Sequence, residues 1–403
     1  MTTNLILFDD PAIRVHLLPF TFTRPVAELR VGILTIAEKW ATWLQTKPSY
    51  LTQPYLQTKF PHQTNAPEHL YINGSLCPTA ALVEAVQTLA VGESLVAPDG
   101  QLLAVRSREP LRQPPQTDAW VARPFAEPIT LISRIWHMLA ENGAQIRVDL
   151  AKITEGRTSQ PITDPFTHCY APENIFLEPG AQVRASVLNA ENGPIYLGKN
   201  AVVSEGSVVI GPFALGEDST VQWGSRMRMN TTIGPFSKVG GEVGNSILIG
   251  YGAKQHDGYL GNSVIGEWCN LGANTNNSNL KNDYTNVKLH SYATDQLEDS
   301  GQMFAGLFMG DFTRAGISTM FNTGTVVGVN VNVYGGGFQP KYIPSFSWGG
   351  ADTGFATYRF EKALQVAREA FVRRGREFDA VEEAILRTIF EQETRRYQSP
   401  EAQ

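Results

Sequence analysis

A six-residue period of apolar side chains runs through the middle of the chain. From residue 195 to residue 242 the sequence divides into consecutive hexads, and the third position of each is aliphatic. These positions are Leu197, Val203, Val209, Leu215, Val221, Met227, Ile233 and Val239. A hexad period is typical of a parallel β-helix, in which each hexad forms one short strand and one turn. Three hexads close a triangular coil, so one aliphatic side chain per face points inward and stacks on the next coil.

The period continues beyond residue 242 with interruptions. Ile265 and Leu271 keep the step of six after one phase slip, and a later run of positions keeps it again. That run consists of Met309, Ala315, Phe321, Val327 and Val333. Between the two blocks, a polar stretch at about 273–300 does not repeat. Insertions in a regular solenoid are where functional residues concentrate, so we expect function near this interruption.

The sequence outside the hexads has other patterns. Residues 1–160 alternate short apolar runs with helical stretches, which predicts an α/β domain. A polar stretch at 151–172 resembles a linker, and residues 173–350 are expected to form a left-handed β-helix. Residues 351–403 contain two amphipathic stretches, which predict helices that cap the solenoid or dock on a neighbouring subunit.

Composition limits the function classes. The 403 residues are 42% hydrophobic and 18% charged, with a net charge of −6 and no basic block, so nucleic acid is not an expected partner. Three scattered cysteines match no metal-ligand spacing and suit a reduced cytoplasm. The sequence contains neither an apolar run of 18 residues nor a signal peptide pattern, so we expect a cytoplasmic protein without a membrane span.

The segment 254–284 departs most from the hexads. It reads KQHDGYLGNSVIGEWCNLGANTNNSNLKNDY and contains His256, a group suited to take a proton near pH 7. Acetyl transfer from a thioester to a sugar amine needs such a base. Asn270 and Asn279 offer amides for sugar hydroxyls, and Lys254 and Tyr259 suit a phosphate. Further phosphate candidates on neighbouring coils are Arg226, Arg228 and Lys238.

The spacing of these residues resembles the acetyltransferase domain of bacterial bifunctional N-acetylglucosamine-1-phosphate uridyltransferase/glucosamine-1-phosphate acetyltransferases and their archaeal relatives. The matching residues are His256, Tyr259, Leu260, Gly261, Asn270 and Asn279. Lys254 stands two residues before the histidine instead of three, and Leu280 replaces a common tyrosine. The resemblance implies acetyl transfer from acetyl-CoA to an amino-sugar phosphate, with His256 and Asn279 as catalytic residues. It also implies a homotrimer with acetyl-CoA bound along the later coils.

Simpler interpretations remain for several of these residues. The asparagines between 274 and 282 are also typical of turns, and Arg226 and Arg228 also suit an exposed face. A zinc-dependent carbonic anhydrase shares the β-helix but needs three histidines, whereas this region contains only His256 and His290. That alternative is set aside.

Residues 4–40 resemble the start of sugar-1-phosphate nucleotidyltransferases, through LPFT at 18–21, Pro25 and LRVG at 29–32. The resemblance implies nucleotidyl transfer from an NTP with Mg²⁺. The metal candidates are Asp9 and Asp10, and the phosphate candidates are Arg14, Arg24 and Arg30. The chain departs from the family at three points, where FDDP replaces the Gly-rich loop, Val26 a lysine and Ser75 a metal-binding aspartate.

The sequence therefore predicts a bifunctional transferase that joins a sugar nucleotidyltransferase-like domain to a β-helix acyltransferase. Two alternatives stay open. In the first, only nucleotidyl transfer is real and the β-helix serves assembly or regulation. In the second, the protein is a non-catalytic scaffold that binds a sugar nucleotide.

Overall fold

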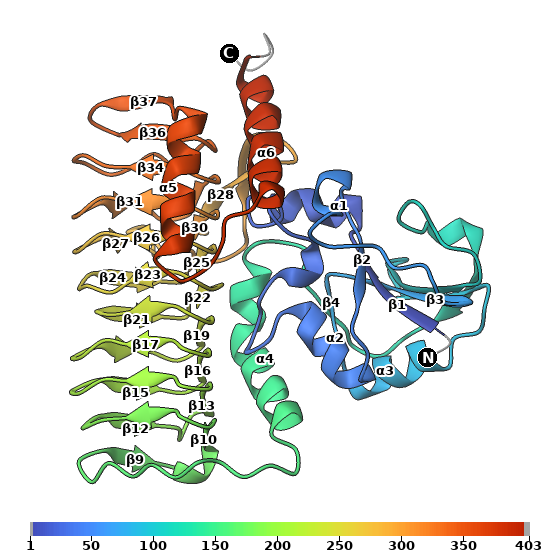
Figure 1. The fold of residues 1–403 in the computed structure, drawn as a ribbon, viewed down its shortest axis with the longest axis horizontal. Helices are drawn as coiled ribbons and strands as arrows, with labels where there is room; N and C mark the ends of the chain where they lie inside the picture. Colours follow the sequence, from blue (N-terminus) through green and yellow to red (C-terminus); the bar gives the residue numbers. More distant parts are fainter. Residues whose placement is uncertain (1–2, 399–403) are drawn as a thin grey trace. The chain divides into compact units, whose positions relative to one another are not determined.

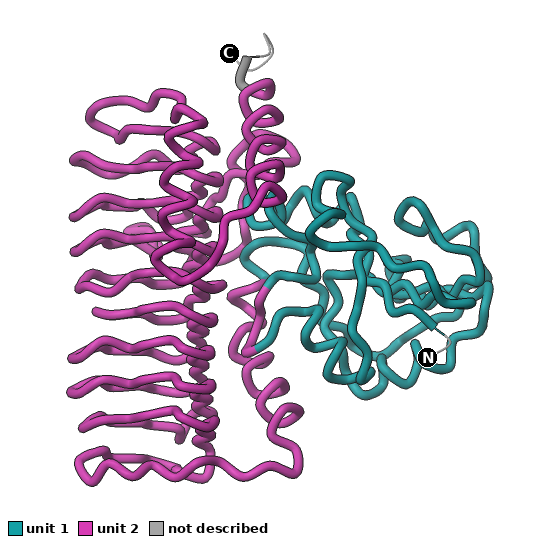
Figure 2. The backbone as a smooth tube through the Cα atoms, viewed as in Figure 1, with its two compact units in different colours: residues 1–29, 34–137 teal, residues 30–33, 138–403 magenta. Residues whose placement is uncertain are grey.

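The computed structural model describes residues 3–398, so residues 399–403 of the expected C-terminal cap lie outside the described range. The chain folds into two compact units, which Figure 2 colours differently. The first, the α/β unit, comprises Met1–Leu29 and Leu34–His137. The second, the solenoid unit, comprises Arg30–Ile33 and Met138–Gln403, so residues 138–160 belong with the solenoid rather than with the α/β unit.

The α/β unit is built around a mixed sheet with the order β2-β1-β3-β6-β5-β7. Its strands are β1 (Thr3–Phe8), β2 (Ser49–Leu51), β3 (Glu68–Asn73), β5 (Glu93–Val96), β6 (Leu102–Ser107) and β7 (Val121–Pro124). β1 runs parallel to β2 and β3, whereas β6 is antiparallel to β3 and β5. A small separate sheet pairs β4 (Leu76–Cys77) with β8 (Thr130–Leu131). The carboxyl ends of β1, β2 and β3 therefore lie at one edge of the sheet.

The helices of this unit begin at side chains that cap them. They are α1 (Pro11–Arg14), α2 (Ile36–Leu44) and α3 (Ala80–Gln87), with short 3₁₀ turns η1 (Val15–Leu17), η2 (Val26–Glu28), η3 (Pro54–Leu56) and η4 (Thr117–Ala119). Thr35 and Glu38 form a reciprocal capping box at the start of α2, and Thr79 caps α3. Caps of this kind stabilise a helix end by about 1 kcal/mol.

The solenoid unit stacks short parallel strands on three faces, as the rungs in Figure 1 show. The β10 face contains β10 (Ile175–Leu177), β13 (Ile195–Leu197), β16 (Phe213–Leu215), β19 (Thr231–Ile233), β22 (Ile247–Leu248), β25 (Val264–Ile265), β30 (Leu307–Met309), β33 (Thr325–Val327) and β35 (Tyr342–Ile343). The β11 face contains β11 (Gln182–Val183), β14 (Val202–Val203), β17 (Thr220–Val221), β20 (Lys238–Val239), β23 (Ala253–Lys254), β26 (Asn270–Leu271), β31 (Arg314–Ala315), β34 (Asn332–Val333), β36 (Ser347–Gly350) and β37 (Gly354–Thr357). The β9 face contains β9 (His168–Tyr170), β12 (Val187–Asn189), β15 (Val208–Ile210), β18 (Arg226–Met227), β21 (Glu242–Gly244) and β24 (Tyr259–Gly261), followed by the pair β27 (Asn276–Asn277) and β32 (Met320–Phe321).

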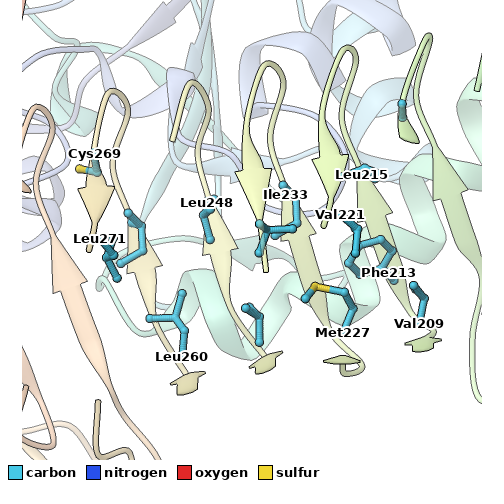
Figure 3. Close-up of a cluster of buried hydrophobic side chains, with 14 of the residues drawn as sticks. Val209, Phe213, Leu215, Val221, Met227, Ile233, Leu248, Leu260, Cys269 and Leu271 are labelled. Carbon is cyan, nitrogen blue, oxygen red and sulfur yellow. The ribbon is translucent and has the colours of Figure 1, made fainter. Parts of the chain in front are cut away.

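The aliphatic positions of the hexads fill the interior of this column. All eight positions from Leu197 to Val239 are buried, and Figure 3 shows several of them pointing inward from successive rungs. The later positions that keep the step of six belong to the same buried cluster. The predicted architecture, an α/β domain followed by a left-handed parallel β-helix and C-terminal helices, is confirmed.

Two polar residues interrupt the interior column. Lys254 pairs in register with Val239, whose side chain points inward, and Asn277 pairs with Phe321 in the same way. Both polar side chains are buried. A buried polar group needs hydrogen-bond partners, so these two residues constrain the coil around them.

A ladder of aromatic rings covers the corner between the β10 and β11 faces. Phe236, Tyr251, Trp268 and Phe312 all have positive φ angles of 52° to 62° and stack with centroid separations of 5.0, 4.2 and 6.5 Å. Phe371 stacks on Trp268 with the ring centroids 3.9 Å apart. The ladder therefore supplies the surface on which the C-terminal helix α5 (Phe360–Val372) packs.

Further elements complete the solenoid unit: α4 (His137–Ile153), α6 (Ala380–Gln398), the 3₁₀ turn η5 (Pro172–Asn174) and a hairpin of β28 (Lys288–Ser291) and β29 (Gln296–Asp299). On α4, Asn142 Oδ1 accepts from Gly32 N at 2.7 Å and from Thr232 Oγ1 at 3.1 Å. Asp149 Oδ2 accepts from Ile33 N at 2.8 Å. Over residues 3–398, no helix has the length and apolar character needed to cross a membrane.

Candidate active site

His256 lies in the turn that follows β23, at the corner where the β11 and β9 faces meet. Successive turns stack at this corner, because Asn274 N donates to Asp257 O at 2.9 Å and Ser318 N donates to Ala273 O at 2.7 Å. The His256 side chain is exposed, and no residue within 3–398 forms a hydrogen bond or ion pair with it. Its imidazole is therefore available to a ligand.

Lys254 holds this turn from inside the coil. The side chain is only 1% exposed, and its Nζ donates to the carbonyl oxygens of Gly240 at 2.9 Å and His256 at 2.8 Å. Burial lowers the pKa of Lys254 to about 8, although the charge of Asp257 opposes the shift. The sequence predicts a phosphate-binding role for Lys254, but in this structure the ammonium faces the interior and tethers the turn that carries His256.

Asn277 holds the other end of the same segment. Its Oδ1 accepts from Gly261 N at 2.9 Å, and its Nδ2 donates to Gly261 O at 3.0 Å. Residues 254–261 are thus anchored at both ends by polar groups inside the column. This arrangement limits the motion of the turn without using the His256 side chain.

Tyr259 and Asn279 form a pair on the β9 face. Asn279 Nδ2 donates to the Tyr259 hydroxyl at 3.0 Å and to Asn262 Oδ1 at 2.7 Å. Burial raises the pKa of Tyr259, although the charge of Arg228 opposes the shift. Tyr259 is therefore protonated near pH 7, and its O–H proton stays available to donate while its oxygen accepts from Asn279.

Arg226 and Arg228 lie on the same face as Tyr259 and share one carboxylate. Arg226 pairs in register with Glu242, which in turn pairs with Tyr259. Arg226 Nε and Arg228 Nη1 each lie 3.4 Å from a Glu242 oxygen, and both arginine side chains are more than half exposed. Exposed pairs of this kind contribute about 0–1 kcal/mol, so an anionic ligand competes with Glu242 at small cost.

Lys238 and Asn270 lie on the adjacent β11 face, in register with Ala253 between them. Both line a cavity of about 270 Å³ beneath α5. The predicted β-helix residues therefore divide between two faces, with His256 at the corner between them and Lys254 inside. Arg314, Arg373 and Arg374 line the same cavity but were not among the residues predicted from the sequence. The pair RR at the end of an amphipathic helix was the available signal for two of them.

In the α/β unit, the Asp9 carboxylate forms hydrogen bonds that stabilise the loop after β1. Asp9 is buried, and its oxygens accept from Arg14 Nε at 3.1 Å, Val26 N at 2.8 Å and Thr52 Oγ1 at 2.6 Å. Burial raises the pKa of Asp9, against the charge of Arg14. Since both carboxylate oxygens already have partners, Asp9 does not fit as a ligand for Mg²⁺.

Asp10 and Asp99 line a cavity of about 740 Å³ that also includes Phe8, at the carboxyl end of β1. Asp10 caps α1 by accepting from Ala12 N at 2.9 Å and also accepts from Gln101 Nε2 at 3.1 Å. In the described residues, no group of three or more His, Cys, Asp or Glu side chains could hold a metal ion. The described lining of this cavity therefore offers two carboxylates, Asp10 and Asp99, but no preformed group of three ligands for Mg²⁺.

The three arginines expected to bind phosphate do not line that cavity. Arg14 is buried against Asp9 and donates to Thr21 O. Arg24 is also buried. Arg30 belongs to the solenoid unit, where its Nε donates to Ile249 O at 3.1 Å. The polar residues that the sequence singles out in this part of the chain are therefore used for internal contacts.

Comparison with known proteins finds similarity over the first part of the chain. Residues 5–158 match the family described as sugar nucleotidyl transferase. The bifunctional protein GlmU of Corynebacterium glutamicum strain R is 33% identical over 153 residues, which cover 34% of this chain and 31% of that protein. GlmU of Methanocaldococcus jannaschii is 37% identical over 101 residues, which cover 25% of this chain and 23% of that protein. A bifunctional sugar-1-phosphate nucleotidylyltransferase/acetyltransferase of Sulfurisphaera tokodaii is 32% identical over 114 residues, which cover 28% of each chain.

The chain thus spans about a third, or less, of the length of these relatives. Among solved structures, an Arabidopsis UDP-N-acetylglucosamine acyltransferase is 11% identical with a TM-score of 0.29, over 61% of this chain and 93% of that one. A likeness at this score has no bearing on fold or function. The family match and the GlmU relatives together fit a divergent GlmU-like protein whose residues 5–158 are similar to sugar nucleotidyl transferases.

Proposed function

We propose that the β-helix transfers an acetyl group from acetyl-CoA to the amine of an amino-sugar phosphate, with His256 as general base. The observation that carries the proposal is the exposed His256 imidazole, without a partner in the described residues, in the turn that leads into β24, whose Tyr259 pairs with Asn279. The GlmU relatives, which are named as bifunctional, support it. The buried anchors Lys254 and Asn277 support it too, because a base acts best when its backbone is held still.

In the proposed reaction the amine nitrogen attacks the thioester carbonyl while the imidazole of His256 takes a proton from that nitrogen. A C–N bond forms, the C–S bond breaks, and CoA leaves as a thiolate that is then protonated. The Tyr259 hydroxyl donates to the acceptor sugar, held in place by Asn279. Asn270 contributes an amide on the adjacent face.

We infer that the active assembly is a homotrimer in which a neighbouring coil covers the His256 corner. The same column of turns exposes Trp223 by 74% and Ile317 by 76%, and large apolar side chains at this exposure suit a subunit interface. Replacing both with Ser is expected to shift the sedimentation of the protein towards monomer. Val121→Ser, at a residue of the α/β unit that is 70% exposed, is the control and leaves the assembly unchanged.

The test of the transferase is CoA release from acetyl-CoA and glucosamine 1-phosphate by the purified full chain. His256→Gln is expected to lower the rate by about 10²–10⁴-fold with unchanged thermal unfolding, because a general base contributes that much. His168→Gln is the matched control, since His168 is another exposed histidine of the β-helix. Equal rates in the wild type and His256→Gln would show that His256 is not the base.

Nucleotidyl transfer by the α/β unit is the second candidate function, favoured by the family match at 5–158. The 740 Å³ cavity gives it a location, although its described lining contains Asp10 and Asp99 but no Lys or Arg. Release of pyrophosphate from sugar 1-phosphates, each NTP and Mg²⁺ tests it. Absence of turnover with every NTP would leave this unit as a binding or assembly domain.

A further inference from the structure

A cavity in the solenoid unit lies beneath the end of α5. Its floor is the β11 face, where Lys238, Ala253, Asn270 and Arg314 lie on successive rungs, and its other wall includes Arg373 and Arg374 at the end of the helix. The aromatic ladder borders it, and Gln255, the residue before His256, also lines it. The volume of about 270 Å³ equals that of roughly nine water molecules, which is enough for a phosphate and part of the group that carries it.

Four cations surround this cavity: Lys238, Arg314, Arg373 and Arg374. Over residues 3–398, none of them forms an ion pair with a carboxylate. Other arginines of the solenoid unit are paired, as Arg368 with Glu383 and Arg157 with Glu178. Like charges gathered in a partly buried space destabilise the fold unless an anion joins them.

Among these four cations, Arg314 most clearly lacks an acceptor for its positive charge. Its Nε is buried and lacks a hydrogen-bond partner in the described structure. Burial lowers the pKa of Arg314, and the neighbouring charge of Arg373 lowers it further. The pKa of Arg374 is lowered by burial and by Arg373 as well. A buried donor without an acceptor destabilises a protein by about 1–3 kcal/mol, and an anion supplies the missing acceptor.

We propose that this cavity binds a phosphate group through Lys238, Arg314, Arg373 and Arg374. Guanidinium groups bind phosphate oxygens in pairs, and three arginines with one lysine match the charge and the several acceptors of a phosphate better than those of one carboxylate. Gln255 places the site next to the turn that carries His256. The source of the phosphate rests on the proposed acetyl transfer: either the acceptor sugar phosphate or the phosphates of CoA.

The direct test is the binding of inorganic phosphate to the full chain, measured by calorimetry at fixed ionic strength with sodium chloride as the balance. Arg314→Gln and Arg373→Gln, singly and together, are expected to weaken binding by about 10–100-fold for each charged contact that is lost. Arg368→Gln is the matched control on the same helix, because its guanidinium pairs with Glu383 outside the cavity. Equal phosphate binding by the wild type and the double variant overturns the proposal.

Thermal unfolding separates a binding role from a structural one. Without phosphate, Arg314→Gln is expected to unfold at the same or a higher temperature than the wild type, since an unpaired buried charge is removed. Added phosphate is expected to raise the unfolding temperature of the wild type more than that of Arg373→Gln, a substitution at an exposed position that should not disturb folding. A loss of stability in Arg314→Gln that phosphate does not change contradicts the proposal.

The same calorimetry identifies the molecule that supplies the phosphate, by comparing the affinities of two pairs of ligands that differ only in one phosphate group. Glucosamine 1-phosphate binding tighter than glucosamine, with the difference lost in Arg314→Gln, assigns the site to the acceptor. CoA binding tighter than dephospho-CoA, with the same loss, assigns it to the 3′-phosphate of the cosubstrate. These measurements need no turnover, so phosphate binding in an enzyme that releases no CoA would keep the site and reject only the acetyl transfer. If these differences in affinity persist in Arg314→Gln, the proposed site is rejected.

Discussion

The turn that carries His256 and the loop that follows β1 both contain the polar residues that the sequence singles out, but they use them differently. In the loop, Asp9 and Arg14 bond to each other and to the surrounding chain, so their groups are occupied. At the turn, Lys254 and Asn277 make the structural bonds from inside the column. His256 is thereby left available. In these two regions, a polar side chain is free to act on a ligand only where other residues already form the hydrogen bonds that fix the backbone.

The largest expected effect tests the structural role of Asp9. Asp9→Asn leaves the Arg14 charge buried without its partner, which is expected to destabilise the α/β unit by about 3–5 kcal/mol. Hydrogen exchange of peptides from this unit, followed through urea unfolding, measures the change.

Asp10→Asn is the control for that variant, because Asn caps a helix about as well as Asp and the stability should change little. If Asp9→Asn were as stable as the wild type but lost nucleotidyl transfer, Asp9 would have a functional role. The β1 loop would then no longer differ from the His256 turn in how it uses its polar residues.

A smaller effect is expected from the pH dependence of Lys254. Its pKa rises from about 8 in the folded chain to 10.5 when unfolded, so the unfolded state binds more protons between these values. Stability linked to this group therefore increases with pH across that window, by roughly 2 kcal/mol between about pH 7.5 and 9.5.

Lys254→Met isolates this contribution, because tyrosines titrate equally in both proteins. The unfolding free energy of the wild type minus that of the variant, measured in urea at both pH values, is expected to increase by roughly 2 kcal/mol as the pH rises. A difference that stays constant would mean that the ammonium is not buried as described.

The smallest expected effect concerns the pair on the β9 face. Tyr259→Phe removes the hydroxyl that accepts from Asn279, a contact worth about 1 kcal/mol, so kcat/KM for acetyl transfer should fall about fivefold to tenfold. Stopped assays of CoA release at varied acceptor concentration measure it. Tyr334→Phe, at a more exposed tyrosine of the solenoid, should leave the rate unchanged. A loss of equal size in both variants would show that the effect is not specific to the pair.

The interior of the solenoid could be predicted from the sequence because one aliphatic residue every six positions is a strong, local signal. Lys254 carried the same signal, since it lies six residues from both Leu248 and Leu260, which are buried. Its charge favoured a binding role, whereas its register indicated an interior one. Register was the better guide, because an extended chain alternates its side chains regardless of their type.

Two other features, the packing of α4 and the cavity beneath α5, could not be predicted from the spacing of apolar residues in the sequence. The helix α4 packs through Asn142, Gly143 and Asp149 as well as through apolar residues, so its buried face does not show the usual amphipathic period. The cavity beneath α5 brings Lys238 and Arg314 together with Arg373, which lies 135 and 59 residues further along the chain. The docking of α5, in which Phe371 stacks on the aromatic ladder, brings Arg373 to the β11 face, and no local spacing reports such a contact.

The hairpin of β28 and β29 separates two blocks of rungs in the column. Below it, neighbouring rungs join residues about 18 positions apart, as Ser219 and Ser237 do, whereas across it Ser263 meets Leu307 at a separation of 44. Closing the longer loop costs only about 1 kcal/mol more. His256 and Asn279 lie before the hairpin, and Arg314 and α5 lie after it. If the chain were divided here, the first polypeptide would carry the proposed acetyl-transfer residues and Lys238, and the second would carry the three arginines of the cavity, so the two would form the phosphate site only by stacking on each other.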